Sequence, residues 1–102
     1  MATGMGKWSE TKDATEGTQK ICDQVKDQVE KQTGKKYRVY TAVKYRIQIM
    51  AGGTNYLIKV DVGEDYDHLS VNQPLVGYQV SPSLSGVEQH QTKDAPLMPF
   101  VN

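Results

Sequence analysis

The hydrophobic period of the sequence changes near Tyr37, and no other feature constrains the possible folds as strongly. Before Tyr37, apolar or small residues recur at the three- and four-residue spacing of one helix face. These residues are Ala14, Thr18, Ile21, Cys22, Val25 and Val29. From Tyr37 onward, alternate residues favour a strand with one buried face. This second set comprises Tyr37, Val39, Thr41, Val43, Tyr45, Ile47 and Ile49. The pattern predicts one amphipathic helix followed by a long strand, which should curve at that length.

Both ends of the helix carry sequence signals. Asp13 and Glu16 have the spacing of a capping box, in which the Asp oxygen accepts an early backbone N–H and Glu16 reaches back. Gly34 is the residue type that most often follows a helix, because it adopts the left-handed conformation without strain. We therefore expect the helix to begin near Asp13 and to end at Gly34.

The later strands follow in sequence order. Ala51-Gly52-Gly53 indicates a turn before a second strand. A turn at residues 63–65 precedes a third strand that includes His68-Leu69. Residues 73–94 alternate only briefly, and the run at 97–101 is a candidate closing strand. Consecutive strands predict an antiparallel meander, so the fold class is α+β, with one N-terminal helix cradled by a curved antiparallel sheet of four to five strands.

Length and composition predict a single cytoplasmic domain over residues 1–102. Residues 1–12 lack periodicity and are expected to form a flexible arm, in which Trp8 either folds back or anchors a partner. Twelve basic and twelve acidic residues cancel, which argues against a nucleic-acid partner. Cys22 is the sole cysteine, as is typical of a reducing compartment, and no apolar leader or membrane span is present.

Groups that could carry out catalysis are scarce in the sequence. Cys22 lies on the apolar helix stripe, where a small hydrophobic residue is needed, so we expect a structural cysteine rather than a thiolate paired with His68 or His90. The two histidines lack further ligands for zinc, and the acidic residues at 64–67 lack the spacing of a calcium loop. The chain is therefore expected to be a binder without a metal or cofactor, and not an enzyme.

The first turn has an unusual flank, because the apolar residues Ile49 and Met50 lie beside it. Loop ends usually face water, so an apolar pair at this place is expected to be covered by the chain or to bind a partner. The segment around it is Gln48-Ile49-Met50-Ala51-Gly52. This segment resembles the Gln-Val-Val-Ala-Gly hairpin of the cystatins, which are reversible inhibitors of papain-like cysteine proteases.

The residues that follow are similar to the stefins, the intracellular branch of the cystatins without disulfides. Thr54-Asn55-Tyr56 and Ile58-Lys59-Val60 look like the stefin strand after the hairpin. The likeness extends over nearly the whole chain. The further positions at which stefins carry the same or similar residues are Asp13-Ala14-Thr15, Cys22-Asp23-Gln24-Val25, Ala42-Val43, His68-Leu69, Val71, Leu97 and Phe100.

The resemblance implies a wedge of three segments that enters the protease cleft and blocks substrate competitively. The first segment is an N-terminal glycine, with Gly6 preferred over Gly4, and the second is the hairpin with Gln48, Ile49, Met50, Ala51 and Gly52. The third is a second hairpin loop, which an ungapped alignment places at Leu75, Val76 and Gly77. The implied partners are cathepsin-type proteases. The implied state is a monomer, with a dimer that swaps the first hairpin as the alternative.

The sequence departs from the family pattern in two ways at the first hairpin. Ile49-Met50 replaces Val-Val, and Gly53 is expected to be an extra residue that lengthens the turn or adds a bulge. In the alternative alignment, residues 76–80 form a later strand, which would delete the second loop. The alternative function is therefore a stefin-fold binding module or scaffold whose altered loops recognise a partner other than a protease.

Overall fold

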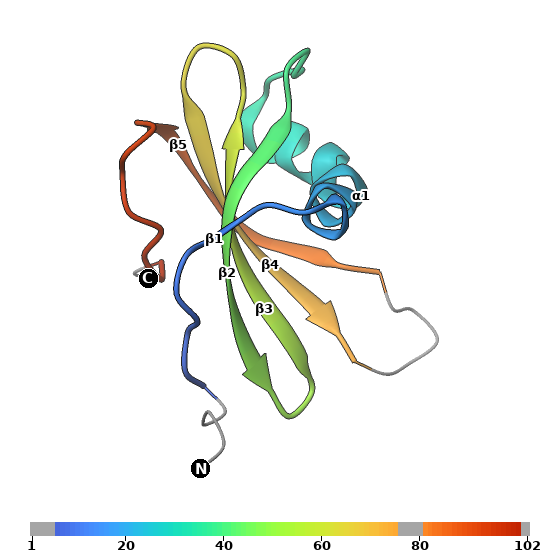
Figure 1. Cartoon of the computed structure of the whole chain (residues 1–102). Coiled ribbons are helices and arrows are strands. Elements are labelled where there is room, and N and C mark those ends of the chain that lie inside the picture. Colours follow the sequence, from blue (N-terminus) through green and yellow to red (C-terminus); the bar gives the residue numbers. More distant parts are fainter. Residues whose placement is uncertain (1–5, 76–80, 101–102) are drawn as a thin grey trace.

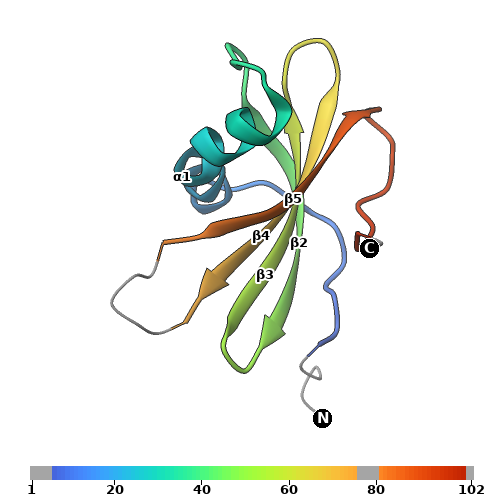
Figure 2. The same cartoon turned by 180° about the vertical axis from the view of Figure 1, so that it is seen from behind.

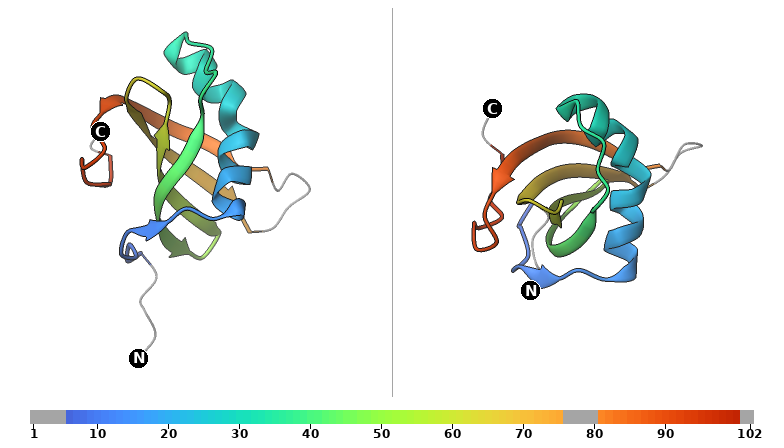
Figure 3. Two further views of the ribbon diagram at one scale, coloured as in Figure 1. Left: turned by 45° about the horizontal axis from the view of Figure 1, so that its top comes forward. Right: turned by 90° about the horizontal axis from the view of Figure 1, so that it is seen from above.

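The computed structural model describes residues 6–75 and 81–100, which form one helix and a five-stranded antiparallel sheet (Figure 1). The strands follow each other across the sheet in the order β1-β2-β3-β4-β5. The elements are β1 (Lys12–Asp13), α1 (Glu16–Thr33), β2 (Thr41–Met50), β3 (Gly53–Asp61), β4 (Tyr66–Pro74) and β5 (Ser83–Gln91). The sheet curves around α1, which lies across one of its faces (Figure 3). The predicted α+β class and the antiparallel meander are confirmed.

The apolar stripe of α1 packs against the middle of the sheet. Cys22, Val25 and Val29 are each 0% exposed. Their buried partners come from the loop before β2, from β3 and from β4. They are Tyr37, Ile58, Val60, Leu69 and Val71. The helix periodicity therefore predicted the core-facing stripe correctly.

The helix begins two residues later than predicted. Thr15 is the N-cap, and it exchanges hydrogen bonds with Thr18 in a capping box. Asp13 instead belongs to β1, where it is paired with Lys44 and forms an ion pair with that side chain. The prediction that Asp13 and Glu16 form the capping box is wrong, because strand pairing holds Asp13 outside the helix. The C-terminal prediction is confirmed, since Gly34 caps α1 with φ of 76°.

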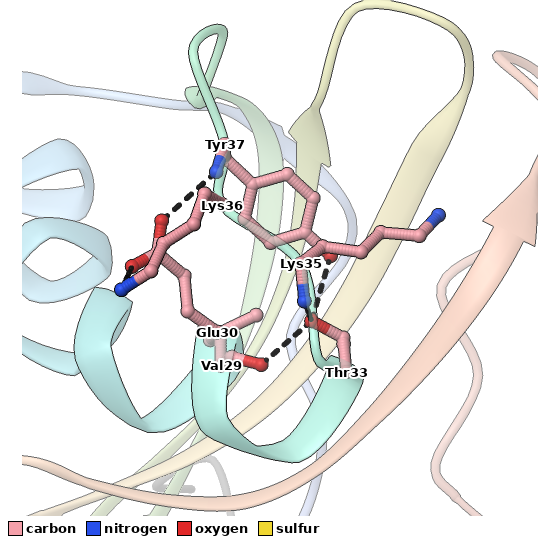
Figure 4. A network of polar contacts seen from close by, with 6 residues as sticks. All are labelled: Val29, Glu30, Thr33, Lys35, Lys36 and Tyr37. Atoms are coloured by element: carbon pink, nitrogen blue, oxygen red, sulfur yellow. Dashed lines mark hydrogen bonds and ion pairs between the residues drawn. The ribbon is translucent and has the colours of Figure 1, made fainter.

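A network of polar contacts shapes the chain after α1 (Figure 4). The Tyr37 backbone N–H donates to the Glu30 carboxylate at 2.9 Å, and the Lys36 ammonium lies 3.8 Å from the same carboxylate. The Thr33 hydroxyl donates to the Val29 carbonyl at 2.9 Å and accepts from the Tyr37 hydroxyl at 3.3 Å. These contacts turn the chain back toward the sheet and bring the Tyr37 ring into the core.

The strand predicted to begin at Tyr37 begins at Thr41, and it contains a register shift between Ala42 and Lys44. Tyr40 and Ala42 pack on the core before the shift, and Tyr45 packs on it afterwards. Val39 is 45% exposed. A bulge inserts one extra residue and exchanges the two faces of a strand. The predicted alternation is therefore correct for Tyr37 and Tyr45, and it is wrong for Val39 and Thr41, which lie just before the shift.

The N-terminal segment lies along the outer edge of β2. The Ser9 N–H donates to the Ile47 carbonyl at 2.8 Å, and the Gly6 N–H donates to the Ile49 carbonyl at 3.1 Å. Trp8 forms an isolated antiparallel bridge with Gln48. Residues 6–12 are therefore hydrogen-bonded, unlike the flexible arm expected over residues 1–12. The physical reason is that β2 would otherwise be an open edge with unpaired backbone groups.

The C-terminal segment covers the face of the sheet opposite α1 (Figure 2). Lys59 is only 3% exposed, and its ammonium donates hydrogen bonds to the carbonyls of Thr92, Lys93 and Ala95 at 2.7 Å each. Arg46 donates to the Leu97 carbonyl. The last strand of the sheet is β5, and the described residues of the 97–101 run lie outside the strands. The prediction that this run forms the closing strand is therefore wrong. The β5 pattern was weak because this edge strand is only half-buried.

Gly53 lies where a side chain would clash with the backbone of β4. A Cβ at this residue would lie 2.3 Å from the Gln73 carbonyl oxygen, whereas a Cβ at Gly52 would meet nothing within 4 Å. Gly53→Ala should therefore lower the free energy of unfolding by about 1–3 kcal/mol, as overpacking does. Gly52→Ala is the matched control and should change it by less than about 0.5 kcal/mol. Urea denaturation measures both values, and equal stability of the two variants would contradict the close approach.

His68 is a buried histidine, and its titration should make the stability of the protein depend on pH. The residue is 1% exposed, its Nε2 has no hydrogen-bond partner in the described structure, and burial together with the Lys59 charge lowers the pKa of His68 to about 4. The unfolded chain, with an ordinary histidine pKa near 6.5, binds more protons between these values, so stability should fall as pH drops from about 6.5 toward 4.

Between pH 7 and 4.5 the loss attributable to His68 should be on the order of 2 kcal/mol. Urea denaturation of the unchanged chain and of His68→Gln at both pH values measures it. The variant should lose less stability than the parent over this interval. The same loss in both proteins would show that His68 is not the titrating group.

Candidate functional site

The first hairpin ends in an exposed apolar tip, which we define as residues 49–52. Ile49 is 58% exposed and Met50 is 42% exposed, at the end of β2 beyond the helix. Met50 is paired with Gly53, so Ala51 and Gly52 alone connect the two strands. The described chain therefore leaves the tip open to a partner.

Gly53 adds no bulge at the tip, because it is the first residue of β3 and the strand register is unbroken there. It is paired with Met50 on one side and with Pro74 on the other. Its missing side chain allows the backbone of β4 to approach closely, and this holds the end of β4 beside the tip.

The second loop begins directly beside the tip. Leu75 is 67% exposed, and its N–H donates to the Gly52 carbonyl at 3.0 Å. Residues 75–82 connect β4 to β5, at the position that the ungapped alignment gives to the second loop. Val76 and Gly77 lie outside the described residues, as do the residues of the alternative strand at 76–80.

The N-terminal glycine lies on the other side of the tip. Gly6 has φ of 88°, a conformation that favours glycine, and its N–H is bonded to Ile49. The Gly6 carbonyl accepts from the Gln48 side chain at 2.8 Å. Gly4, the alternative glycine, lies outside the described residues.

Three segments that are distant in sequence thus come together at one end of the sheet, because Gly6 is bonded to Ile49 and Leu75 is bonded to Gly52. Figure 1 shows the N-terminal segment and the β2–β3 hairpin at this end. Their exposed large apolar side chains are Ile49, Met50 and Leu75. We call Gly6, the tip and Leu75 together the tip cluster. Its chemistry is apolar side chains on hydrogen-bonded backbone, which suits binding to a partly apolar cleft.

Nothing in the described part of the tip cluster is a nucleophile or a general base. Cys22 is buried in the core, where burial and the nearby Asp23 charge raise the pKa of its thiol to about 12. A thiol with so high a pKa stays protonated and unreactive. In the described ranges no group of three or more His, Cys, Asp or Glu residues is arranged to hold a metal ion.

Two polar residues near the tip were not singled out from the sequence. Asn55 on β3 and Asn72 on β4 lie in register with Gln48 and hydrogen-bond to one another across the strands. Asn55 lies in the stefin-like Thr54-Asn55-Tyr56 segment, but no local motif indicates its contacts with Gln48 and Asn72, because these depend on strand register. The register itself could have been inferred from the short turn at Ala51-Gly52.

The family model for the cystatin domain matches residues 6–93, a range that includes the tip, Gly6 and Leu75. The chain belongs to the cystatin family. The predicted resemblance is therefore confirmed, and its stefin character is supported by the similar proteins. Cystatins are inhibitors of cysteine proteases and not enzymes, in agreement with the exposed tip and the inert cysteine.

Similar cystatins cover nearly the whole chain. Cystatin-B of Oplegnathus fasciatus is 43% identical over 89 residues, which are 86% of this chain and 88% of that protein. Stefin-C of Bos taurus is 40% identical over 97 residues, or 94% of this chain and 95% of that protein. Cystatin-B of Homo sapiens is 43% identical over 96 residues, or 93% and 97% respectively.

Proposed function

We propose that this cystatin is a reversible, competitive inhibitor of papain-like, cathepsin-type cysteine proteases. The tip cluster is the proposed protease-binding surface. We propose that this surface extends beyond the tip cluster to Gly4, Gln48, Val76 and Gly77. The whole surface then comprises the N-terminal glycine segment at Gly4 and Gly6, the hairpin residues Gln48, Ile49, Met50, Ala51 and Gly52, and the second loop with Leu75, Val76 and Gly77. The observation that carries the proposal is the exposure of Ile49, Met50 and Leu75 on segments bonded to one another.

The tip cluster supplies both area and preorganisation. Burying apolar surface contributes about 25 cal/mol per Å², so roughly 300 Å² would give on the order of 7 kcal/mol before association costs are subtracted. The hydrogen bonds of Gly6 to Ile49 and of Leu75 to Gly52 already hold the three segments together. Less conformational entropy is then lost on binding.

We further propose that the inhibitory unit is one domain over residues 1–102, active as a monomer in the cytoplasm, with exchange of the first hairpin between two chains as the alternative state. The open, short connection at Ala51-Gly52 joins two long strands, a geometry compatible with such exchange. Within the described residues, no helix is long and apolar enough to cross a membrane.

Inhibition of papain at several substrate concentrations tests this function. Competitive inhibition raises the apparent KM of the protease and leaves kcat unchanged. The inhibitor should be recovered intact, because the tip presents a tight turn rather than an extended segment. Cleavage between Gln48 and Gly53 by trace protease that keeps full activity would identify the chain as a substrate instead.

Met50→Asp separates binding from folding. A charge at the tip should weaken papain inhibition at least about tenfold, because an unpaired carboxylate is desolvated in an apolar cleft. The melting temperature should stay nearly constant, since Met50 is 42% exposed.

Met98→Asp is the matched control, because Met98 is 58% exposed on the C-terminal segment. This control should inhibit papain like the unchanged chain. An unchanged inhibition constant for Met50→Asp would exclude the tip from the binding surface. If the folded parent does not inhibit papain at all, the result favours a binding module for another partner.

A further inference from the structure

A continuous row of side-chain amides crosses three strands directly behind the tip. The Asn72 amide donates to the Asn55 side-chain oxygen at 2.9 Å. The Asn55 amide donates to the Gln48 side-chain oxygen at 2.9 Å. The Gln48 amide donates to the Gly6 backbone carbonyl at 2.8 Å. We call Gln48, Asn55 and Asn72 the amide relay.

Strand register brings the three amides together. Gln48 is directly opposite Asn55, and Asn55 is directly opposite Asn72. Directly opposed residues of antiparallel strands project to the same face and lie within reach of each other. An amide both donates and accepts, so Asn55 and Gln48 each accept from one neighbour and donate to the next, while Asn72 begins the row as a donor. Hydrogen bonds that all run in one direction polarise and strengthen one another.

The two ends of the relay lie on the two segments that flank the tip. One end is Gly6, whose N–H is also bonded to the Ile49 carbonyl. The other end is Asn72, which is opposite Ser83 at the start of β5 and therefore at the foot of the 75–82 connection. The relay thus joins the N-terminal segment, the first hairpin and the base of the second loop.

We propose that the amide relay holds these three segments in one binding geometry and makes the flanking segments bind a protease cooperatively. The proposal rests on the proposed inhibitory function and deepens it. Gln48, Asn55 and Asn72 are positioning residues, and the Gln48 side chain acts within the inhibitor by holding Gly6. Ordering before association reduces the entropy lost on binding, which slows dissociation.

The relay has a direct signature in the free protein. Asn55→Ala removes both hydrogen bonds of the Asn55 side chain and leaves only the bond from Gln48 to Gly6, so the Gln48 amide loses its orientation and Gly6 is held less firmly. Hydrogen exchange of the Gly6 N–H, measured by NMR without any protease, should become at least about threefold faster. Ser70→Ala, on the same sheet face and two residues before Asn72, is the control and should leave that exchange rate unchanged.

The second measurement tests whether Asn72 and the N-terminal segment affect dissociation from papain jointly. Dissociation rates from papain are compared for the unchanged chain and Asn72→Ala, each with and without residues 1–6. In the full chain, Asn72→Ala should speed dissociation about fivefold, and in the truncated chain by less than about twofold, since the relay then has nothing to hold. Asn72→Asp should reproduce this result, because a carboxylate of the same size cannot donate to Asn55.

Thermal melting identifies any variant that loses its fold. If Asn72→Ala is unfolded, Asn72→Asp takes its place in the dissociation measurements. Equal factors in the full and truncated chains would overturn the cooperative role and leave Asn72 with a local effect. Unchanged Gly6 exchange in Asn55→Ala would overturn the positioning role. A parent chain that does not inhibit papain would refute the proposed function, and the Gly6 exchange would still test the relay itself.

Discussion

Burial of the narrow apolar stripe of α1 against the middle of the sheet is the interaction on which the remaining structure depends. Cys22, Val25 and Val29 contact β3 and β4 residues that are themselves completely buried. Because the stripe is short, it covers only the middle of a much longer sheet. At the β2–β3 hairpin the strands extend beyond the helix (Figure 3), and Ile49 and Met50 lie there outside the core. This is why Ile49 and Met50 can be exposed at no cost to the core.

The opposite face of the sheet is organised by cations instead of by a second helix. Lys59 is almost completely buried, and the hydrogen-bond acceptors around its ammonium among the described residues are three backbone carbonyls. Burial lowers the pKa of Lys59. Arg46 similarly joins the carbonyls of Ser9 and Leu97. Buried donors need acceptors, and these two side chains obtain them by holding both terminal segments onto the sheet.

The periodicity predicted α1, its end at Gly34 and the order of the strands, because these features depend on local pattern. The Val43 bulge and the pairing of residues 6–13 along β2 were not predicted, since both depend on contacts across the sheet. The family motif indicated the tip residues directly. By contrast, the link from Asn72 to Gly6 depends on the register of three strands, and an individual asparagine carries no sign of it.

The tip combines residues that are free to vary with one that is fixed by geometry. Ile49 and Met50 are exposed and lie outside the buried core, so they can replace the valines of the family pattern without changing the fold. The replacement changes only the proposed binding surface. Met50 is more flexible than a β-branched residue, and ordering it on binding costs more entropy. Gly53 has no such freedom, because the Gln73 carbonyl occupies the position of its Cβ. The shape of the tip is thus set by Gly53 and the register, while the exposed apolar pair supplies the surface for the proposed binding.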